Sequence, residues 1–330
     1  MTQIINLEHD YGYEETKASH RGKWPNEKDW DKLYSVKDED FSIFKPGNTL
    51  DGKRKPLAHV VVNAYPDDEV RNTLYNINET SEMRANAAGP IDHAQMERMG
   101  MKLGVDYKMK NENSYYKKMK NGKWGMIAYA NQIHSFMIGY KRGRFTGAID
   151  GSGWTKDKKN AETFKKLEKI AEYNENAFAK IDPETHATQK AFAETSIEPQ
   201  WRIGDSPMTT LSVNRYSSQT VTKSMSYHFD SGDTDAGLTT MCVFRQGDYD
   251  GAYLVFPRYR IAIEAPDNSV VIADSNQLHG VSEISGEGTR YSCVCYCDRR
   301  LATKGPTGKP EKLIGVAAKK TASNLEEFLG

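Results

Sequence analysis

Three side chains in the second half of the chain have the types and spacing to bind one metal ion. The stretch SYHFDSGD, residues 226–233, places His228 and Asp230 two positions apart, and His279 follows about fifty residues later. Residues two apart on a strand face the same side, so we expect both ligands in one cavity and Phe229 on the opposite face. Two histidines and a carboxylate cover one face of an octahedral Fe(II) and leave three positions open. A lone H-x-D also fits an ordinary pair of strand residues.

An arginine beyond His279 could hold a second component of such a site. Arg290 follows a Gly-rich turn and opens an apolar run, which favours a buried position over a strand edge. Its guanidinium can hold the distal carboxylate of a dicarboxylate with two parallel hydrogen bonds, which a lysine cannot match. Ser292 would face the same side. Asn214 and Tyr216 precede the ligand segment and either line the co-substrate pocket or belong to a core strand.

Short strand-like runs must position these side chains. Gly, Asp and Asn separate the runs at roughly even spacing, which is typical of a β-sandwich or barrel. The seven runs, between residues 208 and 297, are MTTLSVNRY, SMSYHF, LTTMCVF, AYLVFP, RIAIEA, SVVIAD and RYSCVCYC.

The first 200 residues predict a mixture of helices and strands. LAHVVVN, 57–63, predicts a buried strand, and residues 160–181 predict an amphipathic helix followed by a second helix that Asp182 and Pro183 begin. The remaining expectations are an irregular arm at 1–55, a helix at 66–77, a loop at 83–93, two paired strands within 124–140 and a short helix at 323–329.

The segment 206–300 resembles the Fe(II)/2-oxoglutarate dioxygenases, and within them the TET/JBP family of nucleobase-oxidising enzymes. The resemblance runs through LSVNRY, H-x-D, GAYLVFPRYRIAI, LHGV and R-Y-S, with Ala252 where the family's hairpin usually has a second Gly. It implies Fe(II) bound by the two histidines and Asp230, 2-oxoglutarate held by Arg290 and Ser292, and O2 as oxidant. It also implies extrusion of a base from the duplex.

The same resemblance implies which residues contact the base. Asp233 stands where relatives place a base-contacting Asn or Asp, and Tyr296 matches a pocket position near the end of the last strand. Asp298 stands where several relatives have a histidine. An acid can accept a hydrogen bond from cytosine N4, and a tyrosine can stack. Asp233 is equally compatible with a turn residue in a Gly/Asp-rich hairpin.

Charge is balanced overall, with 45 Lys plus Arg and 45 Asp plus Glu. Residues 102–169 nevertheless carry sixteen basic and six acidic side chains, which suits an anionic partner such as DNA or simply a solvated helical surface. The candidate DNA contacts in this stretch are Lys117, Lys118, Arg142 and Arg144.

Four cysteines without metal-site spacing indicate buried, reduced thiols. The polar, acidic N-terminus is unlike a signal peptide, and no apolar run has the length of a membrane span. We therefore expect an intracellular protein of a reducing compartment, cytoplasm or nucleus, with no membrane partner and a monomeric state.

We predict an α+β protein with a double-stranded β-helix (jelly roll) core and supporting N-terminal helices and strands. Residues 1–330 would form one catalytic unit: a support region at 1–200, the jelly roll at 201–300 and a tail at 301–330. The predicted function is oxidation of the 5-methyl group of 5-methylcytosine or thymine in DNA. Two alternatives are a hydroxylase of protein side chains or small molecules, whose relatives usually have lysine at the place of Arg290, and a jelly roll without activity.

Overall fold

The computed structural model describes residues 2–49, 52–79, 102–111, 114–118, 121–129, 134–143, 147–217, 225–230 and 232–303. The expected loop at 83–93, Arg144 and the expected helix at 323–329 lie outside these ranges.

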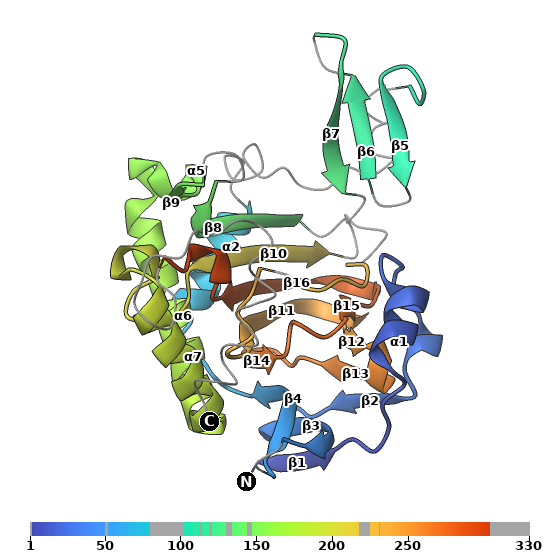
Figure 1. The fold of residues 1–330 in the computed structure, drawn as a ribbon, viewed down its shortest axis with the longest axis vertical. Coiled ribbons are helices and arrows are strands. Elements are labelled where there is room, and N and C mark those ends of the chain that lie inside the picture. The colour runs from blue at the N-terminus through green and yellow to red at the C-terminus, as the bar shows by residue number, and fades with distance from the viewer. Residues whose placement is uncertain are drawn as a thin grey trace.

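A nine-stranded mixed sheet forms the frame of the molecule (Figure 1). The strand order is β1-β3-β4-β14-β11-β16-β10-β8-β9, so strands from the first half of the chain flank four strands from the second half in one sheet. The strands are β1 (Gln3–Asn6), β3 (Phe41–Asn48), β4 (Arg54–Val61), β8 (His134–Arg142), β9 (Ile149–Gly151), β10 (Thr210–Ser217), β11 (Thr239–Gly251), β14 (Ser269–Ala273) and β16 (Ile284–Tyr296).

A smaller sheet covers part of one face of the large sheet. Its order is β15-β12-β13-β2, from β2 (Lys32–Ser35), β12 (Leu254–Phe256), β13 (Ile261–Glu264) and β15 (Gly280–Val281). Apolar side chains of the two sheets, such as Val60, Val243 and Ile263, pack into one core. Two facing sheets with strands drawn from the same C-terminal segment are the arrangement of a jelly roll.

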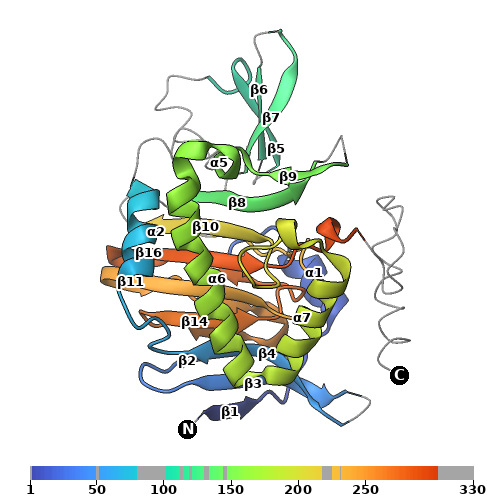
Figure 2. The same ribbon diagram turned by 90° about the vertical axis from the view of Figure 1, so that its left-hand side faces the viewer.

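Helices cover the opposite face of the large sheet (Figure 2). These are α2 (Glu69–Glu79), α6 (Ala161–Ile181) and α7 (Pro183–Ser196), and α6 crosses the sheet diagonally. Leu74, Leu167 and Ile170 are fully buried in a second core with Cys293 and Cys295 of β16. The amphipathic patterns therefore predicted these helices correctly. Asp182 accepts a hydrogen bond from the Thr185 backbone N–H at 3.1 Å, as an N-cap does.

The N-terminal arm is more regular than the sequence suggested. It contains helix α1 (Tyr13–His20), and its strands extend both sheets: β1 pairs with β3, and β2 pairs in parallel with β13. The prediction of an irregular arm was wrong here because these strands form only against distant partners, which local periodicity does not reveal.

Two strands within 124–140 exist, but they do not pair with each other. β7 (Trp124–Tyr129) joins β5 (Tyr107–Asn111) and β6 (Ser114–Lys118) in a separate three-stranded sheet, at the top of Figure 1. β8 instead pairs with β10 and β9. Its Ile138 is buried in the core between the large sheet and the helices, called the helix-side core below. Burial of an apolar strand against the large sheet explains why the local hairpin was the wrong pairing.

Candidate metal and co-substrate site

A cavity of about 400 Å³ lies between the two sheets. Strands β10, β11, β14 and β16 supply walls from the large sheet, and β12 and β15 supply walls from the small one. Residues within 225–230, 232–233 and 275–279 complete the cavity together with Arg300. A cavity of this size is ordinary for a small-molecule site.

The alternation of β10 and β16 explains how the predicted residues reach the cavity. Arg290, Ser292, Val294 and Tyr296 stand at every second position of β16, and all four line the cavity. The antiparallel register places Tyr216 beside Arg290 and Asn214 beside Ser292. The intervening Cys293 and Cys295 face the helix-side core, since successive side chains of a strand point to opposite faces. The spacing of Arg290 and Ser292 predicted that these two side chains face the same side.

His228, Asp230 and His279 converge at the same cavity. Their candidate ligand atoms lie within 4.8 Å of one another. Asp230 Oδ1 is 3.4 Å from His228 Nε2, and Asp230 Oδ2 is 3.7 Å from His279 Nε2. A pair of backbone hydrogen bonds joins the two histidines directly, with N···O distances of 2.9 and 3.1 Å. Residues fifty positions apart are thus held together by a single β-bridge.

Backbone carbonyls fix the orientation of both imidazoles. His228 Nδ1 donates to the Ser226 carbonyl at 2.8 Å, and His279 Nδ1 donates to the Gln277 carbonyl at 2.9 Å. Each bond leaves Nε2 as the nitrogen with a lone pair when the imidazole is neutral, and each Nε2 faces Asp230. Such outer hydrogen bonds are the usual support of metal-bound histidines.

Burial and mutual contact shift the pKa values of the cluster in different directions. Burial lowers the pKa of His279, and the neighbouring His228 lowers it further. Burial also opposes the charged form of His228, but its contact with Asp230 prevails and raises the pKa of His228. Burial raises the pKa of Asp230, yet the two histidines outweigh this and lower it. Asp230 is therefore a carboxylate at neutral pH, as a metal ligand must be.

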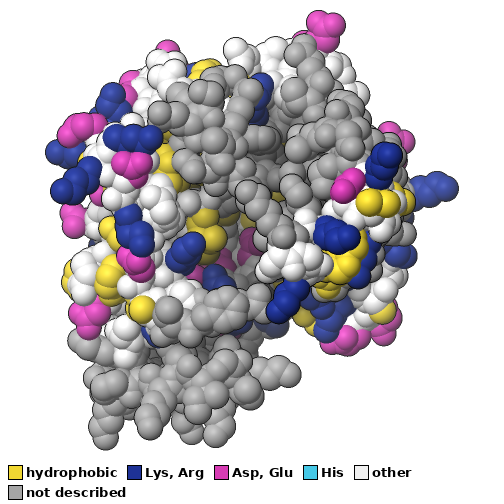
Figure 3. Space-filling view, turned by 90° about the horizontal axis from the view of Figure 1, so that it is seen from above, with side chains coloured by type: hydrophobic (Ala, Val, Ile, Leu, Met, Phe, Trp, Pro, Cys, Tyr) yellow, Lys and Arg dark blue, Asp and Glu magenta, His cyan; other side chains and the backbone are white. Residues whose placement is uncertain are grey.

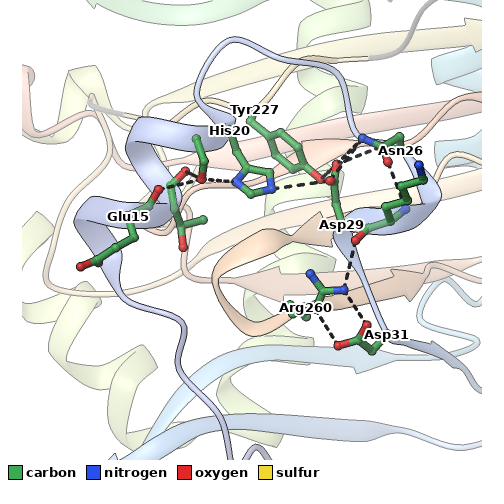
Figure 4. Close-up of polar contacts among 10 residues, drawn as sticks. Glu15, His20, Asn26, Asp29, Asp31, Tyr227 and Arg260 are labelled. Carbon is green, nitrogen blue, oxygen red and sulfur yellow. Dashed lines mark hydrogen bonds and ion pairs between the residues drawn. The ribbon is translucent and has the colours of Figure 1, made fainter.

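The segment that carries these ligands is held by the N-terminal arm (Figure 4). The Tyr227 hydroxyl donates to Asp29 Oδ2 at 2.8 Å, and the backbone N–H of Asn26 donates to the same oxygen at 2.9 Å. His20 Nε2 lies 3.5 Å from Asp29 Oδ1. Backbone bonds also join Tyr227 to Gly22 and Lys23. Long-range contacts, and not a strand ladder, thus position the first ligand histidine.

The ligand segment forms only an isolated bridge, and Phe229 within it borders the cavity while its ring packs against the N-terminal arm. Phe229 was expected on the face opposite His228 and Asp230, as on a regular strand. Its ring lies 5.5 Å from that of Tyr13 in α1, and the guanidinium of Arg21 lies 5.9 Å from its centre.

Arg290 is buried without an acidic partner. No salt bridge pairs it with a carboxylate in the part of the chain that the structure describes, and its Nε has no hydrogen-bond partner there. Its Nη2 donates a weak hydrogen bond to the Met241 sulfur at 3.4 Å. Burial lowers the pKa of this guanidinium, with Tyr249 opposing the change. A buried cation in this state is a place for an anion.

Asn214 and Tyr216 also line the cavity. Asn214 Oδ1 is buried without a partner among the described residues, whereas the Tyr216 hydroxyl accepts the Ile284 backbone N–H at 2.9 Å. Asn214 Oδ1 is therefore open to a hydrogen-bond donor, and the Tyr216 hydroxyl keeps its own O–H to donate.

The three residues expected to contact a base differ in their surroundings. Tyr296 and Asp233 line the cavity. Asp233 is 1% exposed, and its carboxylate accepts hydrogen bonds from the Thr239 and Ser275 hydroxyls and the Thr234 backbone. Burial raises its pKa to about 7 against these bonds. Asp298 is 1% exposed, and both of its oxygens bind the guanidinium of Arg300, which does line the cavity.

The basic residues proposed for DNA have varied surroundings. Arg142 donates to the carbonyls of Gly147, Arg300 and Ala302, so its guanidinium holds backbone. Lys118 is exposed at the end of β6. Lys117 lies on β6, but its side chain is outside the described set, as is Arg144. Among the coloured side chains in Figure 3, Lys and Arg are interspersed with Asp and Glu.

Several lining residues were not predicted from the sequence. Arg300 belongs to the 3-10 helix at Arg299–Leu301, beyond the last strand, and Met241 lies on β11 opposite Val294. Thr239 and Ser275 surround the Asp233 carboxylate. The alternation of LTTMCVF indicated Thr239 and Met241 as one face; no local signal indicated Arg300.

A jelly roll whose cavity joins two histidines, a carboxylate and a buried arginine is the arrangement of an oxygenase of the 2OGFeDO superfamily, a class that depends on 2-oxoglutarate, Fe(II) and O2. Within that class, residues 151–299 match the family model described as Tet_JBP, oxygenase domain of the 2OGFeDO superfamily. This segment is therefore similar to the oxygenase domain of that family, as its motifs indicated.

Two curated relatives match part of the chain. The protein from Trypanosoma brucei brucei (strain 927/4 GUTat10.1) named bifunctional helicase and thymine dioxygenase JBP2 is 32% identical over 127 residues, 38% of this chain and 10% of the relative. The protein of the same name from Leishmania braziliensis is 24% identical over 142 residues, 42% of this chain and 12% of the relative. The matching part of the chain thus spans about a tenth of these relatives.

A solved structure confirms the fold. The structure described as NgTET1 in complex with 5mC DNA superposes with a TM-score of 0.52 at 12% identity, over 94% of this chain and 96% of that one. The predicted α+β jelly roll with N-terminal support is therefore correct. None of the helices in the described ranges has the length and hydropathy needed to cross a bilayer.

Proposed function

We propose that this chain is an Fe(II)- and 2-oxoglutarate-dependent dioxygenase that oxidises the 5-methyl group of a pyrimidine base in DNA. The observation that carries the proposal is the convergence of His228, Asp230 and His279 beside the unpaired guanidinium of Arg290 in one cavity. The two histidines and Asp230 could hold a metal ion, and Arg290 could hold a dicarboxylate. The match of the surrounding segment to the Tet_JBP oxygenase domain supports both assignments.

The residues fit Fe(II). Two imidazole Nε2 atoms and a carboxylate are a donor set that suits this ion and leaves positions for other ligands. The carbonyl bonds to each Nδ1 keep both Nε2 atoms directed at Asp230 without further reorganisation. His228, Asp230 and His279 would hold the metal.

The residues also fit 2-oxoglutarate. Arg290 would bind the distal carboxylate through paired hydrogen bonds and so satisfy its unpartnered Nε. Ser292, Asn214 and Tyr216 would line the same end. When bound, Fe(II) with O2 and 2-oxoglutarate supplies the oxidation: a methyl C–H becomes C–OH, and 2-oxoglutarate becomes succinate and CO2.

The names of similar proteins support a pyrimidine 5-methyl group as the substrate. JBP2 is a thymine dioxygenase by name, and NgTET1 was solved with 5mC DNA. In this chain Phe229 and Tyr296 supply aromatic surface for an extruded base, and Asp233 adds a buried acid. The walls around them would exclude water from the methyl group. Lys117, Lys118 and Arg144 would contribute phosphate contacts.

The proposal extends to the setting of the protein. All four cysteines are free and buried, which supports work in a reducing intracellular compartment. We also propose that the chain acts as a monomer and that residues 1–200 and 201–300 form one catalytic unit, with 301–330 as a tail. The nine-stranded sheet that both segments share supports a single unit.

Mass spectrometry of nucleosides tests the function. The protein is incubated with DNA that contains 5-methylcytosine and thymine, together with Fe(II) and 2-oxoglutarate, and 5-hydroxymethyl nucleosides and succinate are measured. We expect both products from the native sequence. Succinate formation with peptides and none with DNA would contradict the proposal.

A ligand variant provides a readout that does not depend on turnover. We expect Asp230→Ala to lower Fe(II) affinity at least about 100-fold in anaerobic equilibrium dialysis, since one of three ligands is lost. The fold should persist by circular dichroism. His9→Ala, at an exposed histidine, is the matched control and should bind Fe(II) normally. Normal Fe(II) binding by Asp230→Ala would remove the ligand assignment.

A further inference from the structure

Two arginines reach the cavity, and Arg300 is the one that the function above leaves without a role. We infer that Arg300, oriented by Asp298, donates a hydrogen bond to the O4 carbonyl of the substrate base and thereby favours thymine over 5-methylcytosine. This inference rests on the proposed function and specifies its substrate.

Asp298 fixes the orientation of Arg300. Arg300 Nε donates to Asp298 Oδ1 and Nη2 donates to Oδ2, each at 2.7 Å, and the Arg300 backbone N–H donates to Oδ1 at 3.0 Å. The Asp298 backbone N–H donates to the Thr209 hydroxyl at 2.9 Å. Arg142 additionally holds the carbonyls of Arg300 and Ala302. Asp298 therefore holds the guanidinium of Arg300, and the bonds from Arg142 and to Thr209 hold the backbone around it, although the Arg300 side chain is 58% exposed.

A glycine allows the guanidinium to approach the metal-ligand segment. A Cβ atom at Gly232 would lie 2.9 Å from Arg300 Nη2 and 3.1 Å from Cζ, which is closer than side chains pack. Gly232 is two residues beyond Asp230, and both Gly232 and Arg300 line the cavity. The free N–H groups of Arg300 therefore stand at the cavity wall beside the proposed ligands.

The charge of the pair determines what those N–H groups can bind. The guanidinium and the Asp298 carboxylate together are neutral, so the pair offers directed donors with little net attraction for a phosphate. Arg290, in contrast, keeps its full positive charge, because no carboxylate within the described ranges pairs with it. Of the five donors of Arg300, Asp298 uses two, and a neutral carbonyl oxygen suits the remainder.

The acceptors at the cavity are less available than these donors. Asp233 was expected to accept from the N4 amine of cytosine, but three donors already bond its carboxylate. Thymine presents an O4 acceptor at the position where cytosine presents the N4 donor. An N–H donor of Arg300 can bond to the O4 acceptor of thymine. With cytosine the same N–H would face the N4 amine, which is also a donor, and no hydrogen bond would form. Both observations favour thymine.

Paired oligonucleotides test the inference. Each carries a single thymine or a single 5-methylcytosine in the same sequence, with uracil at every other thymine position. The ratio of kcat/KM for thymine to that for 5-methylcytosine is measured with the full chain. We expect a ratio above one, and Arg300→Gln and Asp298→Asn should each lower it about tenfold, through a loss on thymine. The KM for 2-oxoglutarate should not change.

Arg299→Gln is the matched control, because Arg299 is adjacent, pairs with Asp235 and does not line the cavity. Its ratio should equal that of the native sequence. An equal loss on both bases with a weaker salt dependence would assign Arg300 to phosphate and overturn the inference, as would a native preference for 5-methylcytosine. Oxidation of neither base by the native sequence would instead refute the proposed function itself.

Discussion

At the scale of single residues, the chemistry of the cavity depends on which polar atoms already have partners. The two imidazole Nδ1 atoms are bound to carbonyls, and Arg300 is bound to Asp298, whereas Arg290 Nε and Asn214 Oδ1 have no partner in the described structure. Unsatisfied buried groups are costly in a folded protein and usually mark a site that a ligand completes. The end of the cavity near Arg290 is therefore the place for the co-substrate.

Replacing Arg290 should affect co-substrate binding first. We expect Arg290→Lys to raise the KM for 2-oxoglutarate about 10- to 100-fold, because lysine keeps the charge but loses the paired hydrogen bonds. Succinate formation at varied 2-oxoglutarate concentration measures the effect. Arg245→Lys is the control, since Arg245 pairs with Glu264 outside the cavity. An unchanged KM in Arg290→Lys would show that the guanidinium does not hold the co-substrate.

At the scale of elements, the junction of α6 and α7 is tied to the large sheet by a buried contact. Asp182 caps α7, and its Oδ2 lies 3.3 Å from Nε2 of His59 on β4, whose Nδ1 lies 2.8 Å from the Ser42 hydroxyl. Burial on its own raises the pKa of Asp182, but the bonds with His59 and Thr185 prevail and lower it below its ordinary value of 3.8. The helix layer therefore depends on an ionised carboxylate.

This pKa shift predicts how stability changes with pH. A carboxyl group with a lowered folded-state pKa stabilises the fold above its unfolded value and loses that contribution as the pH falls through the folded value. We expect Asp182→Asn to lower the free energy of unfolding by about 1 kcal/mol at pH 7, since asparagine still caps the helix. The difference from the native sequence should vanish below about pH 3.

Urea unfolding across this pH range measures the difference. Asp157→Asn serves as the control, because Asp157 also caps a helix but its pair with Lys159 is exposed. It should change stability by less than about 0.5 kcal/mol at either pH. A loss in Asp182→Asn that stays constant down to pH 3 would exclude an electrostatic origin.

At the scale of the whole molecule, strands of both halves share one ladder. β4 pairs with β14, and β2 pairs with β13, so the N-terminal strands cannot separate from the jelly roll without breaking hydrogen bonds of both sheets. We expect residues 2–303 to unfold in a single transition. Hydrogen exchange followed by mass spectrometry should show loss of protection in β4 and in β11 at the same denaturant concentration. Earlier loss in β4 would reveal two cooperative units.

The sequence predicted the site better than the pairing of strands, for physical reasons. His228, Asp230, His279 and Arg290 have distinctive chemistry at spacings that a β-strand aligns, and the stripe of α6 repeats over many turns. The β7–β8 pair was wrong because strand pairing depends on which edges are available across the fold. Arg300 was missed because its place follows from Asp298 and Gly232, which meet only after folding.

The parallel pairing of β2 with β13 has a consequence for synthesis. Lys32 is matched to Ile261, so more than two hundred residues must leave the ribosome before β2 finds its neighbour. Contacts this far apart slow folding. Until then Asp29 also lacks Tyr227, and the first histidine has no anchor. The nascent chain therefore has no functional pocket during most of its synthesis. The pocket is among the last parts of the molecule to form.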